Sequence, residues 1–252
     1  MANFWNIVNS VIERSDILLE VIDSRIPDFT RNQEVEDKVK RAGKRLILVL
    51  NKVDLISQQV AEQEKKRLSK EFPVVFVSTK EHHGTKLLRE AILSRTEKFE
   101  VVVGVLGYPN TGKSSVINVL KGRKAASTSS HAGHTRAMQK IRVTNRILML
   151  DTPGVVPFQE KDEAKHVLLG AVMFSEAGNP ELAAVEIIKH CNAINKRIIL
   201  DYYHVEETED EYALIEKIAA KRNILAKGGV LDTERAARLV IQDWQTGKIK
   251  LK

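Results

Sequence analysis

A glycine-rich segment near the middle of the chain has the residue types and the spacing of a phosphate-binding loop. Residues 107–115 read GYPNTGKSS, which satisfies the pattern G-x-x-x-x-G-K-[ST] between an apolar run and a helical pattern. Backbone N–H groups at a helix N-terminus attract phosphate, and Gly112 lets the backbone approach it closely. Lys113 is expected to reach the β and γ phosphates, and Ser114 is expected to ligate Mg²⁺. This segment therefore predicts a site for a nucleoside triphosphate.

A second motif, DTPG at Asp151–Gly154, also follows an apolar run. Asp151 is expected to hold Mg²⁺ through water, and the Gly154 N–H is expected to contact the γ phosphate. In the segment HAGHTRAMQ between the two motifs, Thr135 is expected to sense Mg²⁺ and the γ phosphate, although residues 127–130 offer other hydroxyl groups. The predicted magnesium ligands are thus Ser114, Thr135 and Asp151.

The segment LNKVDL at residues 50–55 carries side chains that can read a guanine base. Asp54 can accept hydrogen bonds from guanine N1–H and from its 2-amino group, for which adenine offers no matching donors. Asn51 is expected to tie the base edge to the phosphate loop, and the stem of Lys52 is expected to lie over the base. A buried carboxylate left unpaired by the wrong base is unfavourable, so the motif predicts a preference for guanine.

The tripeptide STK at Ser78–Lys80 ends another apolar run and completes the predicted base site. The Thr79 N–H is expected to bond guanine O6. Each short motif is weak alone, but each of them follows its own predicted strand. The predicted nucleotide-binding residues are Asn51, Lys52, Asp54, Ser78, Thr79, Lys80, Asn110, Thr111, Gly112, Lys113, Ser114, Ser115, Thr135 and Gly154.

Short apolar runs alternate with helical patterns over the part of the chain that carries these motifs. Runs rich in Val, Ile and Leu are typical of buried parallel strands, and their alternation with helices predicts an α/β doubly wound sheet. The last two runs are separated by two residues and predict an antiparallel hairpin. The predicted strands cover 16–23, 45–52, 74–79, 101–107, 140–144 and 147–152, and the predicted helices 32–42, 58–71, 84–97 and 114–121.

Beyond the DTPG motif the pattern is helical. We expect a small all-helical domain that starts between Val167 and Asn179, with Asp232 as a helix cap and Glu234 and Arg238 as an i,i+4 pair. The predicted domains are therefore residues 1–170 and residues 171–252. Cys191 recurs with apolar residues at helical spacing and is expected to be a buried thiol.

Composition favours a protein of the cytoplasm with an acidic partner. The chain has 252 residues, a net charge of +7 and one cysteine, which excludes an internal disulfide and suits a reducing compartment. No apolar run approaches the roughly 18 residues that span a bilayer, so we expect no membrane contact. Residues 116–150 hold seven Lys and Arg and no Asp or Glu. That stretch fits a solvated face and contact with a polyphosphate backbone equally well.

The order of the motifs is unusual, because the base motif precedes the phosphate loop. The usual GTPase order has been cut after D-x-x-G and rejoined, which is tolerable because ligands bind at the carboxyl ends of parallel strands in whatever order the chain visits them. This order, DSRIP at residues 23–27 and the tail at residues 228–249 resemble the circularly permuted GTPases of the YlqF/RbgA type. In departure from that family, the chain has no His before His82, Thr79 where Ala is usual, and AGHT where PG-x-T is usual.

The resemblance implies a circularly permuted Ras-like P-loop GTPase domain followed by a small helical domain that contacts ribosomal RNA. It further implies a protein that binds GTP and GDP and acts on a precursor of the large ribosomal subunit. We expect this protein to be a monomer. Two other functions stay open. One is a GTP-dependent RNA-binding module with vestigial hydrolysis, and the other is a GTPase that acts on tRNA or small-subunit RNA.

Slow intrinsic hydrolysis is expected from the residue after D-x-x-G. Ras-like enzymes place a Gln there to orient water, whereas this chain has Val155, whose side chain can neither orient nor polarise water. Asn110 is expected to help hold K⁺ near the β/γ bridge, unless it only shapes the loop. The candidate catalytic residues are Lys113, Asn110, Thr135 and Gly154.

Overall fold

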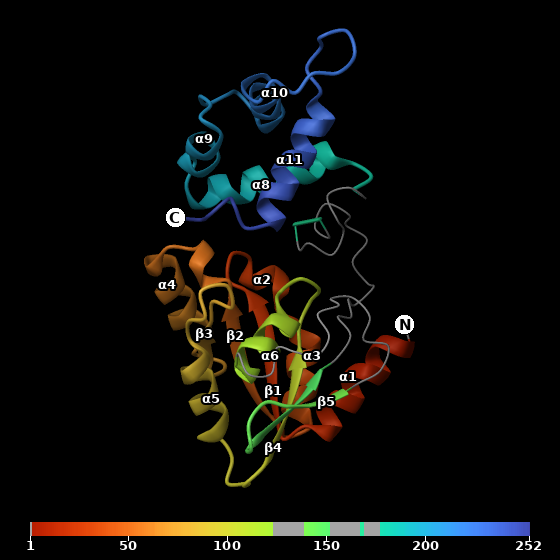
Figure 1. Ribbon diagram of the computed structural model, residues 1–252, viewed down its shortest axis with the longest axis vertical. Coiled ribbons are helices and arrows are strands. Elements are labelled where there is room, and N and C mark those ends of the chain that lie inside the picture. The colour runs from red at the N-terminus through yellow and green to blue at the C-terminus, as the bar shows by residue number, and fades with distance from the viewer. Residues whose placement is uncertain (1, 123–138, 152–166, 169–176) are drawn as a thin grey trace. The chain divides into compact units, whose positions relative to one another are not determined.

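The computed structural model of the chain describes residues 2–122, 139–151, 167–168 and 177–252 (Figure 1). Its internal contacts divide it into two compact units, Met1–Gln159 and Glu160–Lys252. The domain boundary between residues 170 and 171 stays a prediction. Every helix in the described ranges is too short or too polar to cross a membrane.

The first unit is built on one sheet with the strand order β3-β2-β1-β4-β6-β5. All neighbouring strands are parallel except β5 and β6, which form the predicted antiparallel hairpin. The doubly wound α/β fold is therefore confirmed. The strands are β1 (Ile17–Asp23), β2 (Arg45–Asn51), β3 (Val74–Phe76), β4 (Val101–Leu106), β5 (Gln139–Arg142) and β6 (Ile147–Asp151).

Helices cover both faces of this sheet, because successive side chains of a strand point to opposite faces. Ile17, Leu19 and Val21 of β1 belong to a core that α5 and α6 complete. Leu18 and Ile22 belong to a second core that α1, α3 and α4 complete. The helices of this unit are α1 (Ala2–Arg14), α2 (Pro27–Thr30), α3 (Gln33–Arg41), α4 (Gln58–Leu68), α5 (Thr85–Leu93) and α6 (Lys113–Lys121), with a 3₁₀ turn at Val53–Leu55 (Figure 1).

The path of the chain through the sheet reverses between β1 and β4. From β1 the chain moves outward to β2 and β3, and it then returns to β4 on the other side of β1. In an open α/β sheet, ligands bind outside the carboxyl ends of the strands at such a reversal. Because β4, β1 and β2 are parallel neighbours, the motifs that follow them come out at the same edge.

The second unit is helical, as the sequence predicts. It contains α8 (Pro180–Ile194), α9 (Arg197–Tyr203), α10 (Glu211–Lys221) and α11 (Thr233–Gln245). The side chain of Asp232 caps α11, Arg238 pairs with Glu234 at 2.9 Å, and Cys191 is fully buried, all three as expected. Helix α9 was not predicted, because its short apolar run RIILDYY has no helical period long enough to recognise.

A buried acid lies on the same face of β1 as Leu18 and Ile22. Glu20 is 1% exposed, and its Oε1 accepts a hydrogen bond of 2.8 Å from the backbone N–H of Asn32. The neighbouring carboxylate of Glu36 is held by two bonds of 2.7 Å from Arg31. Burial, and after it the negative charge of Glu36, raise the pKa of Glu20 well above its ordinary value.

This raised pKa predicts that the contribution of Glu20 to the stability of the protein falls as the pH rises above the ordinary glutamate pKa. The proton that Glu20 binds in the folded state stabilises the fold fully below the ordinary glutamate pKa, and this contribution is lost as the pH rises through the raised pKa. Glu20→Gln keeps the shape and cannot lose a proton. We expect it to raise the melting temperature at pH values above the ordinary glutamate pKa and to flatten the decline of stability with pH. Thermal unfolding across pH, with the exposed Glu62→Gln on α4 as the control, measures this, and parallel curves for wild type and Glu20→Gln would contradict it.

Candidate functional site

The phosphate-loop segment lies between β4 and α6, as its sequence predicts. Helix α6 starts at Lys113, and Gly112 precedes it with φ +99°. The Lys113 ammonium donates to the carbonyl oxygens of Gly107 at 2.9 Å and Tyr108 at 2.6 Å. The Thr111 hydroxyl also donates to the Tyr108 carbonyl, at 2.9 Å. The loop thus curls around the ammonium group, a position from which a lysine can reach phosphate oxygens.

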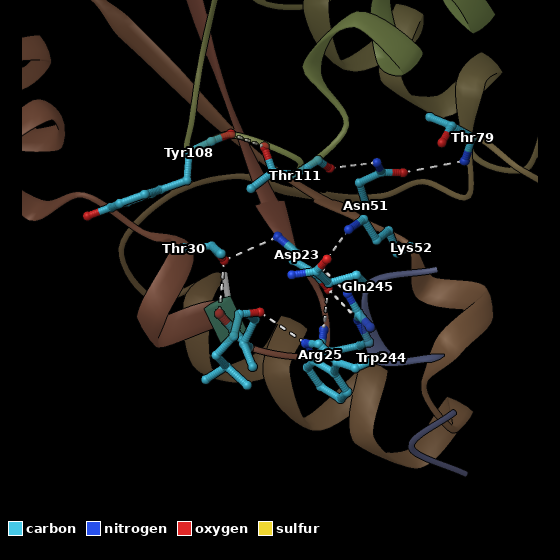
Figure 2. A network of polar contacts seen from close by, with 12 residues as sticks. Asp23, Arg25, Thr30, Asn51, Lys52, Thr79, Tyr108, Thr111, Trp244 and Gln245 are labelled. Carbon is cyan, nitrogen blue, oxygen red and sulfur yellow. Dashed lines mark hydrogen bonds and ion pairs between the residues drawn. The ribbon is translucent and has the colours of Figure 1, made fainter. Parts of the chain in front are cut away.

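Asn51, the last residue of β2, joins the base motif to two other motifs (Figure 2). Its side-chain Nδ2 donates to the carbonyl oxygen of Thr111 at 2.8 Å, and its Oδ1 accepts from the Thr79 N–H at 3.3 Å. Asn51 is 1% exposed, so neither bond is weakened by competing water. One amide therefore connects three loops that follow three different strands.

Asp54 and Ser78, from the base motif and the STK tripeptide, are joined by a hydrogen bond. The Ser78 hydroxyl donates to Asp54 Oδ1 at 2.7 Å and also accepts from the Glu81 N–H at 3.1 Å. A carboxylate accepts through two oxygens, so this bond leaves Asp54 with acceptor capacity for a ligand. The Thr79 N–H, which the sequence analysis assigns to guanine O6, donates to Asn51 in this structure.

Lys52 makes an ion pair that the sequence analysis missed. Its ammonium lies 2.8 Å from Oδ2 of Asp23, the last residue of β1, and Arg25 grips the same carboxylate through Nε at 3.1 Å and Nη2 at 2.7 Å (Figure 2). Burial alone would raise the pKa of Asp23, but the charges of Arg25 and Lys52 outweigh it and hold this pKa far below its usual range. The sequence shows that Asp23 lies at the end of a buried strand, but it does not show that Lys52 pairs with this carboxylate.

Of the remaining predicted site residues, some are exposed, one is described by its backbone alone, and some lie outside the described residues. Asn110 is exposed with φ +58°, and Ser114 and Ser115 are exposed in the first turn of α6. Lys80 is exposed after β3. Asp151 ends β6, but only its backbone is described. Thr135, Gly154 and Val155 lie outside the described residues.

A metal centre made of protein ligands alone is not seen in the described ranges, where no group of three or more His, Cys, Asp or Glu is placed to hold an ion. Mg²⁺ at a phosphate site usually takes one or two protein oxygens and completes its shell with phosphates and water. The exposed hydroxyl of Ser114, one residue after Lys113, suits that chemistry.

Two family descriptions match parts of the chain. The description "50S ribosome-binding GTPase" matches residues 102–222, and "RsgA GTPase" matches residues 37–161. The uncharacterized GTP-binding protein MJ1464 of Methanocaldococcus jannaschii is 42% identical over 96% of this chain and 65% of its own length. Nucleolar GTP-binding protein 2 of Pneumocystis carinii is 35% identical over 97% of this chain and 52% of its own length. The chain thus spans between about half and two thirds of these relatives.

Two solved structures of YlqF from T. maritima have the same fold. The GNP-bound structure matches with a TM-score of 0.69 at 23% identity and covers 99% of this chain and 96% of that one. The GDP-bound structure of TM YlqF matches with a TM-score of 0.68 at 26% identity, over 96% and 95% of the two chains. Both matches extend over the sheet and the helical unit.

The contact between the phosphate loop and the base motif predicts that replacing Gly112 by a residue with a side chain destabilises the protein. A Cβ at Gly112 would collide with Asn51 Nδ2, and φ +99° is itself unfavourable for alanine. Gly43 has a similar φ of +64° but nothing within 4 Å of a built Cβ. We expect Gly43→Ala to lower the free energy of unfolding by about 1 kcal/mol. Gly112→Ala should lower it by roughly 2–4 kcal/mol, because the collision adds to the backbone term. Chemical denaturation measures both, and equal losses would contradict the close approach.

Proposed function

Because the chain belongs to the circularly permuted GTPases of the YlqF type, we propose that it binds GTP and GDP, hydrolyses GTP and assists maturation of the large ribosomal subunit. Asn51 carries this proposal, since its amide links the phosphate loop to the base motif. Lys113 and Asp54, far apart in sequence, then serve one nucleotide.

The guanine base is placed by residues that follow β2 and β3. Asp54 accepts from guanine N1–H and the 2-amino group with the acceptor capacity that Ser78 leaves it. The stem of Lys52 lies along the base face. Asn51 fixes the distance between this pocket and the phosphate loop.

The phosphates and the metal ions are placed by residues near β4 and β6. Lys113 contacts the β and γ phosphates, and Mg²⁺ is held by Ser114 together with Asp151 and Thr135. The Gly154 N–H contacts the γ phosphate. Asn110 helps to hold K⁺ near the β/γ bridge, where positive charge stabilises the charge that develops on the leaving group.

Ribosomal RNA in a large-subunit precursor is the proposed macromolecular partner. The family description names the 50S subunit, and several relatives are called nucleolar. The chain end supports RNA contact, because Lys248, Lys250 and Lys252 are exposed and alternate with the buried Ile249 and Leu251. Binding to RNA through such cations weakens with salt. The protein acts as a monomer. It acts in the compartment that holds the precursor particles, and in a cell without a nucleus this compartment is the cytoplasm.

The nucleotide state is proposed to control contact with the particle. The chain runs from the DTPG motif into the helical unit, so a change at the γ phosphate can bias the helical unit in the manner of other GTPase switches. A second candidate function, an RNA-binding module whose hydrolysis is vestigial, is favoured by Val155 in place of the water-orienting Gln.

The base site predicts that GTP displaces a labelled GDP from the protein and that ATP does not. In Asp54→Asn the new amide N–H groups face the donors of guanine, so GTP affinity should fall about 10- to 100-fold. Xanthosine triphosphate should gain affinity relative to GTP, since its 2-oxo group accepts from an amide. Competition titrations measure both preferences. Equal displacement by ATP and GTP in the wild type would end the proposal.

Hydrolysis by the isolated protein is expected to be slow and to rise when large-subunit precursor particles are added, because a partner must supply the group that orients water. Phosphate release is measured with the protein alone, with large-subunit particles, with small-subunit particles and with tRNA. The same reactions are run in potassium chloride and in sodium chloride, and GTP hydrolysis should be faster in potassium chloride.

Each arm of this assay excludes one reading. Fast turnover by the protein alone contradicts the role given to the partner, and stimulation only by tRNA or small-subunit particles supports the alternative substrate. A particle-bound protein that never hydrolyses GTP supports the vestigial reading. Equal rates in the two salts remove K⁺ from the proposal.

Pelleting with particles should be stronger with a non-hydrolysable GTP analogue than with GDP.

A further inference from the structure

The carboxylate of Asp23 is shared by two cations at the edge of the sheet where the base motif lies (Figure 2). Oδ1 accepts from the backbone N–H and the Nε of Arg25 at 3.0 and 3.1 Å. Oδ2 accepts from Arg25 Nη2 at 2.7 Å and from Lys52 Nζ at 2.8 Å. Asp23 and Arg25 are 3% and 4% exposed, so this cluster is part of the interior.

The backbone around Asp23 holds its carboxylate in one orientation. Asp23 is the register partner of Asn51, and the Ser24 N–H donates to the Asn51 carbonyl at 2.9 Å. The Asp23 N–H donates to the hydroxyl of Thr30 at 3.1 Å. Together with the two hydrogen bonds from the Arg25 guanidinium, these bonds hold the Asp23 carboxylate in one orientation. A group that binds Oδ2 is therefore held in a fixed position.

Lys52 binds Oδ2 of this carboxylate, and holding Lys52 in its observed conformation is unfavourable for two reasons. Its side chain has a long flexible stem, and ordering such a stem costs up to about 2 kcal/mol of conformational entropy. Its backbone has φ +64° and ψ +30°, a left-handed conformation that lysine rarely adopts. The bond to Asp23 fixes the end of the stem, and the lysine is thereby ordered before any ligand arrives.

The charges explain why Asp23 and not a neutral residue is needed. Burial, followed by the positive charge of Arg25, lowers the pKa of Lys52, and Asp23 opposes both. Without the aspartate charge, the buried Arg25 guanidinium and the partly buried Lys52 ammonium would face each other with no anion between them, and Lys52 would turn away or lose its proton.

We propose that Asp23 is a positioning residue of the guanine site, which fixes the Lys52 ammonium so that the lysine stem lies ready along the base face. Arg25 in turn holds the Asp23 carboxylate. The inference rests on the proposed function, because it assigns Lys52 to the base. A preordered contact improves affinity by removing the ordering entropy from the binding step. Base discrimination remains with Asp54, which reads the 2-amino group.

Four proteins test this proposal: wild type, Asp23→Asn, Lys52→Met and the double variant. Affinities for GDP and for inosine diphosphate, which lacks the 2-amino group, are measured by calorimetry on the full chain with Mg²⁺. Asp23→Asn is expected to weaken GDP about tenfold or more. Lys52→Met keeps the stem without its charge and should lose a similar factor. The double variant should bind no more weakly than Lys52→Met, because Asp23 acts through Lys52.

Two readouts separate positioning from damage to the fold. The ratio of GDP to inosine diphosphate affinity should stay at the wild-type value in Asp23→Asn, since Asp54 is untouched. The control is Asp16→Asn, at the other end of the β1 segment, where Asp16 pairs with Lys98 at 2.6 Å. It makes the same chemical change away from the base motif and should keep wild-type GDP affinity. If Asp23→Asn does not fold, Asp23→Glu replaces it, because glutamate keeps the charge but displaces the Lys52 ammonium. Asp23→Glu should weaken GDP binding in the wild-type background and should cause no further loss of GDP affinity when it is added to Lys52→Met.

The outcomes that overturn the inference are distinct from those that overturn the proposed function. Wild-type affinity in Asp23→Asn, or an equal further loss when Asp23→Asn is added to Lys52→Met, rejects the positioning role while GDP binding itself stands. A wild-type protein that does not bind GDP rejects the proposed function and this inference with it.

Discussion

The two hydrogen bonds of the Asn51 side chain are the contact on which the site depends. Without them the phosphate loop, which follows β4, and the STK loop, which follows β3, would have only the sheet between them. The primary amide can donate to Thr111 and accept from Thr79 at the same time, which neither a carboxylate nor a hydroxyl of that length could do with the same geometry. Burial keeps both bonds free from competition by water, and the missing side chain of Gly112 makes room for the amide.

The circular permutation is compatible with this contact because a parallel sheet is assembled by neighbours in space. Asn51 and Thr111 are sixty residues apart in the chain, yet β2 and β4 flank the same strand β1. The strand order places the end of β1 between them, so Asp23 occupies the middle of the site. A chain that visits the strands in another order reaches the same arrangement, provided that each motif stays at the carboxyl end of its own strand.

The sequence predicts those parts of the site that act through local pattern. The apolar runs of β2 and β4 mark buried strands, and a motif directly after a buried strand lies at the sheet edge, as Lys113 and Asp54 do. The ion pair of Asp23 with Lys52 could not be predicted, because the register of β1 and β2 brings the two residues together, whereas Arg25 lies only two residues further along the chain. Helix α9 was missed because seven residues with three apolar positions in a row carry no usable period. Thr135, Gly154 and Val155 lie outside the described residues, so their roles rest on sequence alone.

Two aspartates of this site illustrate how one side chain can serve structure or binding. Asp23 gives both its oxygens to Arg25 and Lys52, and its buried negative charge is fully engaged within the protein. Asp54 gives one oxygen to the hydroxyl of Ser78, a neutral donor, and in the proposed function its remaining acceptor capacity serves the guanine base. The charges of both acids act on Lys52, but its ion pair is with Asp23. In the proposed function, this arrangement leaves the Asp54 carboxylate to the guanine base.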